Sequence, residues 1–235
     1  MDGAVNHSRP EPYRASLRGV LRPIQAALLS GEELYHEVVL RRMAAARESL
    51  WIATANVKAM LVEDGPGAFR PILGLFADLA RRGVELRLLH AELPSRPFRA
   101  AFEAQRSLWT KLQLKICPRV HFKTVLVDGA WIYLGSANLT GAGLGAKGAG
   151  KRNFELGLVT EDFDTIDRVT ALYESVWSGV ECARCRLHDV CPDPIGPGPR
   201  RQGRAARREE GEAAGIQLGR PRRLMASARP RPSRS

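Results

Sequence analysis

The sequence lacks the long apolar runs that membrane-spanning helices need. No stretch of about 18 uninterrupted apolar residues occurs in its 235 residues. Residues 1–14 contain no basic stretch followed by an apolar one, so they do not predict a secretory signal. Cysteine is also scarce, with four residues in the chain. We therefore expect a cytoplasmic protein without a transmembrane segment, whose cysteines are thiols or metal ligands rather than disulfides.

Basic residues are in excess, but they are unevenly distributed. Residues 196–235 contain eleven arginines against three glutamates, a net charge of +8, which leaves +3 of the total +11 for residues 1–195. A segment this rich in proline, glycine and arginine cannot bury a core, so we predict a disordered tail. Such a tail binds polyanions loosely or is simply solvated. The body of the protein is not strongly basic.

Predicted strands alternate with predicted helices along the chain. Apolar residues at helical spacing predict a helix over 32–48, and the apolar, β-rich run 49–57 predicts a strand. The same criteria predict further helices over 71–83, 95–107 and 162–176, and further strands over 84–90, 112–117, 120–128, 131–136 and 154–160. Residues 64–67, Asp-Gly-Pro-Gly, break the chain. This order indicates an α/β layered fold, and no second copy of the pattern is present.

One cluster of polar residues has a highly specific spacing. His121, Lys123 and Asp128 form the pattern H-x-K-x-x-x-x-D within the predicted strand 120–128. Because strand side chains alternate between two faces, His121 and Lys123 should point the same way. After a gap of six residues beyond Asp128 comes Gly-Ser-Ala-Asn, with Ser136 and Asn138, and residues 153–155, Asn-Phe-Glu, follow. A histidine and a lysine alone would indicate only a partly exposed strand, whereas the joint spacing indicates a catalytic site.

The stretch 120–159 closely resembles the HKD repeat of the phospholipase D superfamily, and the similarity extends over roughly residues 30–178. The resemblance implies a phospholipase D-like fold, a mixed β-sheet flanked by helices on both faces, with one repeat per chain as in single-repeat bacterial nucleases. We accordingly divide the chain into an amino-terminal extension (1–29), a catalytic domain (30–180), a cysteine-rich segment (181–195) and the tail (196–235).

The resemblance also implies a reaction. In this family a histidine attacks a phosphodiester and forms a covalent phosphohistidine, which splits one difficult step into two. A second histidine protonates the leaving oxygen, and a single His121 cannot serve as both groups. We therefore expect a homodimer in which two copies of His121 share one site. No metal or other cofactor is needed for this chemistry.

The resemblance assigns supporting roles to the other residues of the pattern. Lys123 would hold the non-bridging phosphate oxygens as a cation, and Ser136 and Asn138 would donate hydrogen bonds to them. Glu155 would orient a His121 ring. Asp128 would be a structural or supporting acid rather than a proton donor.

The cysteines suggest a separate metal site. Cys182 and Cys185 form a CxxC pair, Cys191 follows, and Cys117 lies just before the strand that carries His121. CxxC spacing suits a structural zinc, with Cys117 or His188 as the fourth ligand. An iron–sulfur cluster is the second hypothesis for a bound metal. Without a metal, the cysteines would be reduced thiols or a redox pair.

The sequence leaves three functions open. We favour a nuclease, because the chain is compact, carries one repeat and ends in a basic tail. A phospholipase D or transphosphatidylase shares the same chemistry, but the sequence shows no long apolar loop for lipid chains. A non-catalytic nucleic-acid-binding module is the third reading, and the intact His121 and Lys123 argue against it.

Overall fold

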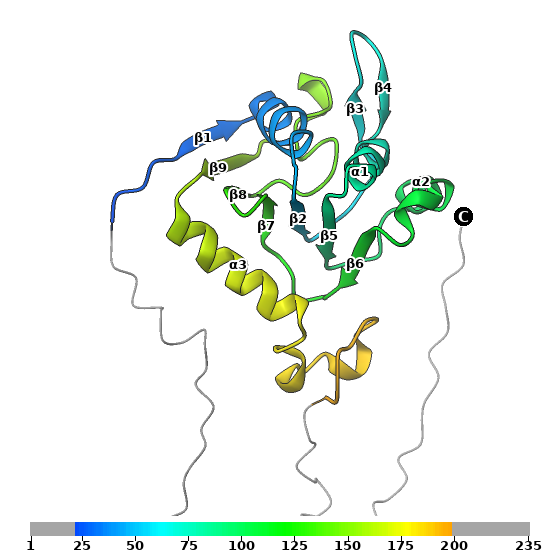
Figure 1. The fold of residues 1–235 in the computed structure, drawn as a ribbon, viewed down its shortest axis with the longest axis vertical. Helices are drawn as coiled ribbons and strands as arrows, with labels where there is room; N and C mark the ends of the chain where they lie inside the picture. The colour runs from blue at the N-terminus through cyan, green and yellow to red at the C-terminus, as the bar shows by residue number, and fades with distance from the viewer. Residues whose placement is uncertain (1–21, 199–235) are drawn as a thin grey trace, which may run out of the picture. The chain divides into compact units, whose positions relative to one another are not determined.

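The computed structural model describes residues 22–198, which build a mixed sheet of seven strands in the spatial order β1-β9-β8-β7-β2-β5-β6. Strands β2, β5 and β6 are parallel to one another, and the other neighbouring pairs are antiparallel. Figure 1 shows the sheet through the middle of the fold. The strand bounds are β1 Ala27–Ser30, β2 Ser49–Thr54, β5 Glu85–His90, β6 Leu112–Ile116, β7 Lys123–Val127, β8 Trp131–Gly135 and β9 Leu156–Thr160.

Helices cover both faces of this sheet. The π-helix η1 (Leu34–Met43) and the helix α1 (Ile72–Arg81) pack on one face and form the larger apolar core. The helix α3 (Phe163–Trp177) covers the other face, where its Tyr173 packs in a smaller core with Ile132 of β8. Figure 1 shows α3 lying along the sheet. The predicted arrangement, a mixed sheet flanked by helices on both faces, is confirmed.

The remaining elements are short. A small hairpin made of β3 and β4 stands apart from the main sheet, and its turn is the Asp-Gly-Pro-Gly break that the sequence predicts. The bounds are β3 Leu61–Glu63, β4 Phe69–Pro71, α2 Arg96–Ala104, η2 Arg106–Leu108, η3 Ala149–Lys151, η4 Cys182–Arg184 and η5 His188–Val190. Among the described residues, no helix has both the length and the apolar character to cross a membrane.

Local sequence accounts for the main helices. Seven of the ten residues of α1 are buried, as expected for a helix whose apolar residues face a sheet. At the start of α3 the carboxylate of Asp162 accepts a hydrogen bond of 2.9 Å from the backbone N–H of Thr165. This N-cap satisfies a donor that the first turn of a helix leaves free. Arg22 forms an ion pair with the same carboxylate.

The structure differs from the expected elements in three places. The edge strand β1 and the hairpin strands β3 and β4 were not predicted, because each has only three or four residues and shows no clear alternation. Residues 27–29, assigned from sequence to the extension, therefore pair with β9. The predicted strand 120–128 begins only at Lys123, so His121 precedes the strand. The tail from residue 199 and the first 21 residues lie outside the described residues.

Candidate active site

The polar residues of the motif gather at one edge of the sheet. Lys123 begins β7 and pairs with Gly135, which ends β8, and Gly135 pairs with Gly157 at the start of β9. On the other side of β7, Ala53 near the end of β2 pairs with Thr124. Antiparallel pairing thus brings the start of β7, the end of β8, the start of β9 and the end of β2 to the same edge.

His121 and Lys123 are in direct contact. The Lys123 Nζ lies 3.3 Å from Nδ1 and 3.4 Å from Nε2 of the His121 ring, and it donates a hydrogen bond of 2.6 Å to the His121 carbonyl oxygen. Lys123 is 9% exposed, whereas the imidazole is exposed. A buried ammonium that holds the backbone of His121 leaves the ring open to solvent beside a fixed positive charge, which suits attack on a phosphate anion.

Ser136 and Glu155 form the second pair at this edge. The Ser136 hydroxyl donates a hydrogen bond to Oε2 of Glu155, and Oε1 of Glu155 accepts one of 3.1 Å from the Asn153 amide. Both predicted residues therefore lie together. Within the described residues, the Glu155 oxygens accept these bonds rather than one from the His121 ring of the same chain. Asn153 belongs to the sequence pattern, but its orienting contact with Glu155 was not predicted.

Asn138 is held by the end of β2. Its Oδ1 accepts hydrogen bonds, each of 3.1 Å, from the Thr54 hydroxyl and the backbone N–H groups of Ala55 and Asn56. The Thr54 hydroxyl also accepts a bond of 3.0 Å from the Leu139 N–H. With its oxygen fully engaged, Asn138 has its amide Nδ2 left as the donor for a ligand. Thr54 was not predicted as a site residue, although a polar residue at the end of an apolar strand is a signal for one.

A buried tyrosine explains the glycine of the Gly-Ser-Ala-Asn pattern. The Tyr133 side chain lies across Gly135 and Gly157, where added Cβ atoms would stand 2.2 Å from its Oη and 2.1 Å from its ring. The Tyr133 Oη accepts a hydrogen bond of 3.2 Å from the Ala137 N–H, and burial raises the pKa of the phenol to about 12. The neutral tyrosine therefore shapes the backbone between Ser136 and Asn138.

Asp128 lies away from the other residues of the motif. It follows the end of β7, five residues after Lys123 and so about 17 Å along the strand. Its carboxylate accepts backbone hydrogen bonds from Arg47, Glu48 and Ser49, at 3.1, 2.8 and 2.9 Å. Its backbone has φ +54°, in the left-handed region that aspartate tolerates better than most residues. The structure thus places Asp128 as a clamp between β7 and the start of β2.

All four cysteines line one cavity on the α3 face. Cys117, Cys182, Cys185 and Cys191 share it with His188. Burial raises the pKa of the Cys117 thiol, and the neighbouring cysteines 191 and 182 raise it further. Within residues 22–198, however, no three histidine, cysteine or acidic side chains already form a metal-binding group. The structure thus places the predicted ligands on one cavity, but their sulfur atoms are not arranged as the ligands of a single ion.

His90, at the end of β5, is a satisfied buried histidine. It is 1% exposed, and its Nδ1 lies 2.7 Å from the Glu92 carbonyl oxygen. Burial lowers its pKa, so the ring is neutral and donates this bond. His90 has the environment of a core residue rather than that of a second proton donor.

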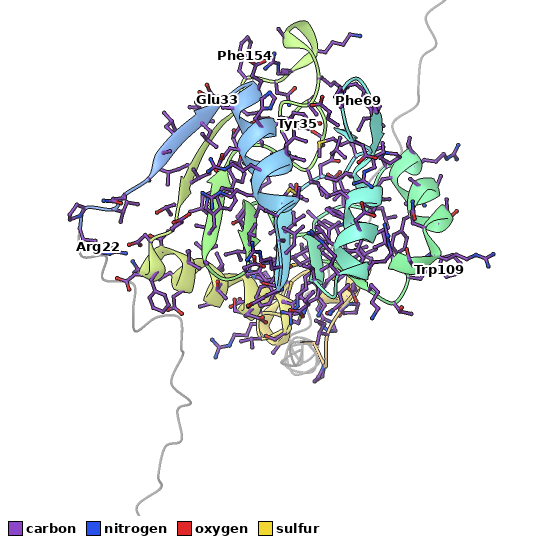
Figure 2. The ribbon with its side chains drawn as sticks, turned by 45° about the horizontal axis from the view of Figure 1, so that its top comes forward. Arg22, Glu33, Tyr35, Phe69, Trp109 and Phe154 are labelled. Atoms are coloured by element: carbon purple, nitrogen blue, oxygen red, sulfur yellow. The ribbon has the colours of Figure 1, made fainter. Side chains whose placement is uncertain are left out.

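Exposed apolar side chains flank the site on β1 and β9. Leu28 is 68% exposed and Leu156 58%, and pairing places both on the α3 face of the sheet, which α3 leaves uncovered at this edge. Phe154, immediately before Glu155, is fully exposed at the outside of the molecule (Figure 2). Apolar side chains gathered beside a polar site are typical of a surface that another chain covers.

Comparison with known proteins gives one family. The family model described as "Cardiolipin synthase, PLD-like domain" matches residues 39–177, more than half of the chain. The matched range contains His121, Lys123, Ser136, Asn138 and Glu155. No curated protein matches the sequence closely enough to count as a relative.

Solved structures with a similar chain path are distant in sequence. The phospholipase D family member Nuc from Salmonella typhimurium is 18% identical, with a TM-score of 0.48, over 66% of this chain and 95% of its own. NucT from Helicobacter pylori is 17% identical, with a TM-score of 0.46, over 66% of this chain and 97% of its own.

Proposed function

Since the chain belongs to the phospholipase D superfamily, as the family match over more than half of its length shows, we propose that it is a nuclease that cleaves phosphodiesters through a phosphohistidine. The observation that carries the proposal is the pairing of an exposed His121 ring with the buried Lys123 ammonium, 3.3 Å away. The ring is the nucleophile, and the cation offsets the repulsion between it and the phosphate.

The reaction proceeds in two steps, formation and then hydrolysis of the phosphohistidine. A ring nitrogen of His121 attacks phosphorus, the P–N bond forms, and the P–O bond to the leaving group breaks as that oxygen takes a proton from a second imidazole. Water then attacks phosphorus and gives a proton to the second imidazole while the P–N bond breaks. Lys123 binds the non-bridging oxygens in both steps, and Ser136 and Asn138 donate hydrogen bonds to them.

The second imidazole is His121 of another copy of the chain. Within the described residues the remaining histidines do not serve: His90 is buried in the core, His188 lies on the cysteine cavity, and His36 lines another cavity at the opposite ends of β8 and β9. The exposed Leu156 and Phe154 flank Glu155 and provide an apolar surface for a homodimer beside the site. In that dimer Glu155 orients the imidazole of the partner chain.

Nucleic acid is the proposed substrate. Three exposed lysines lie on loops that follow or contact the segment after Asn138: the Lys58 N–H bonds the Leu139 carbonyl at 3.1 Å, the Lys147 N–H bonds the Gly141 carbonyl at 3.0 Å, and Lys151 lies on the same loop. Such cations suit a polymer with a charge at every residue better than a single lipid headgroup. The arginine-rich tail adds charge in sequence, but lies outside the described residues.

The test compares substrates under one set of conditions. The full-length protein is incubated in EDTA with labelled single-stranded DNA, RNA and phosphatidylcholine vesicles. We expect cleavage of nucleic acid and, on acid and alkali treatment, an acid-labile, base-stable protein-bound phosphate. Wild type and H121N are compared with H36Q, which changes an exposed histidine on η1. Cleavage of the lipid alone would refute the substrate class, and full activity of H121N would refute the mechanism.

The shared site needs its own experiment. Wild-type and H121N chains are mixed in varied ratios, unfolded and refolded together. If each site requires two intact copies of His121, activity falls with the square of the wild-type fraction. A linear fall of activity would contradict the dimer-shared site but would not contradict the phosphohistidine mechanism.

A further inference from the structure

The four cysteines of the chain meet at one place although 65 residues separate Cys117 from Cys182. Cys117 follows β6, whereas Cys182 begins the short helix η4 beyond α3, and Cys185 and Cys191 directly follow η4 and η5. Surface thiols with no common role have no reason to converge on one cavity. All four cysteines that the chain possesses line this one.

The segment that carries three of these cysteines has little apolar packing of its own. The helices η4 and η5 have three residues each and bury none of them, and Val180 and Val190 are exposed. A polar link joins it to the sheet: the Ile116 N–H donates a bond of 3.1 Å to the Asp193 carboxylate. A segment this poor in core contacts needs another bond to hold it, and metal ligation supplies one in small modules.

We propose that Cys117, Cys182, Cys185 and Cys191 bind one zinc ion, which fixes the segment 179–195 to the end of β6. The four sulfurs do not yet stand at ligand distances within residues 22–198, so binding closes the cavity around the ion. Four cysteines line this small cavity, and four thiolates are the ligand set of a tetrahedral structural zinc site.

The fourth ligand is Cys117 rather than His188. The Nε2 of His188 lies 2.9 Å from the Gly196 carbonyl oxygen and is engaged there as a donor. Its Nδ1 faces the Asp189 carboxylate at 3.8 Å. Both nitrogens of the ring are therefore turned toward residues close to it in sequence, whereas Cys117 is the one cysteine that directly follows a strand of the sheet.

Zinc with four thiolates carries a net charge of −2. Two cations, Lys115 and Arg119, and two carboxylates, Glu181 and Asp193, line the same cavity, and Arg119 lies 3.9 Å from Glu181. The charges of the lining therefore cancel, and the thiolates themselves neutralise the ion. The Lys115 ammonium also lies 4.7 Å from the centre of the Trp177 ring, at the end of α3. Cys117 starts the loop that ends at His121, so the ion also fixes one end of the segment that carries this histidine.

The test measures metal in the full-length chain, purified with a reductant and without oxygen. We expect one zinc per chain by elemental analysis, displaced when a mercurial reagent titrates the four thiols. C117S and C185S should each lose the zinc, whereas the matched control H188A should keep it. Without zinc, trypsin should cleave after Arg184 and Arg186 about tenfold faster or more, since cleavage follows local opening.

Each alternative outcome contradicts a defined part of the proposal. If C117S retained zinc and H188A lost it, the fourth ligand would be His188 instead of Cys117. Iron with acid-labile sulfide would overturn zinc, and metal-free protein after supplementation with zinc would overturn the site. If the serine variants fail to fold, the mercurial titration of the wild type decides: thiols that react without releasing zinc refute the proposal.

Discussion

Asp128 offers the sharpest test of how the motif is built, because the structure separates it from the residues that we propose bind phosphate. Its carboxylate accepts three backbone N–H groups at the start of β2, and its backbone is left-handed. Replacing Asp128 with glycine, alanine or asparagine separates the effect of the accepted hydrogen bonds on stability from the effect of the left-handed backbone. Glycine removes the acceptor oxygens but adopts the left-handed conformation without strain. Alanine removes the acceptors and also strains this conformation, and asparagine keeps Oδ1 as an acceptor.

The expected losses follow from the hydrogen bonds. A net contribution of about 1 kcal/mol for each bond makes D128G less stable by about 3 kcal/mol. D128A should lose about 1 kcal/mol more, since its Cβ strains the left-handed backbone. D128N keeps Oδ1, which accepts from Arg47, Glu48 and Ser49, and replaces only Oδ2, which shares the Arg47 N–H, so it should lose only about 1 kcal/mol. For a domain of this size the Tm should fall by about 2–4 °C for each kcal/mol.

Thermal unfolding by circular dichroism gives the stability order, and hydrolysis of bis(p-nitrophenyl) phosphate, a small phosphodiester, gives turnover. At a temperature where D128N is fully folded, its turnover should stay within about threefold of wild type, because about 17 Å of strand separates it from Lys123. An unchanged Tm in D128G would refute the clamp. A loss of turnover greater than about a hundredfold in a fully folded D128N would show that the carboxylate takes part in catalysis.

Three further changes test other parts of the structure. G157A places a Cβ 2.1 Å from the Tyr133 ring, so chemical unfolding should show a loss of about 1–3 kcal/mol. N138A removes the acceptor of three hydrogen bonds, and we expect turnover to fall at least about tenfold with a smaller effect on KM. The pKa of Asp162 is lowered, chiefly by its bond to Arg22, so the carboxylate stabilises the fold above the unfolded pKa, about 3.9. The Tm difference between wild type and D162N should therefore shrink as the pH falls below about 4; a constant difference would contradict it.

The sequence by itself determined the family, the layered α/β class and the residues proposed to bind phosphate. Helical and strand periodicities are local properties, so α1, α3, β5 and β8 could be predicted close to their observed bounds. The spacing of His121, Lys123, Ser136, Asn138 and Glu155 also lies within a short stretch, where strand pairing leaves few arrangements.

Only the tertiary structure decided which parts of the motif act together. Asp128 stands among the catalytic residues in sequence, but a strand extends the chain by about 3.3 Å per residue, so β7 carries it to the opposite edge. Thr54 and Cys117 reach their partners only when distant strands pair. The short strand β1 forms because β9 offers it free backbone groups. Those contacts depend on pairing between segments far apart in the chain, which no local pattern contains.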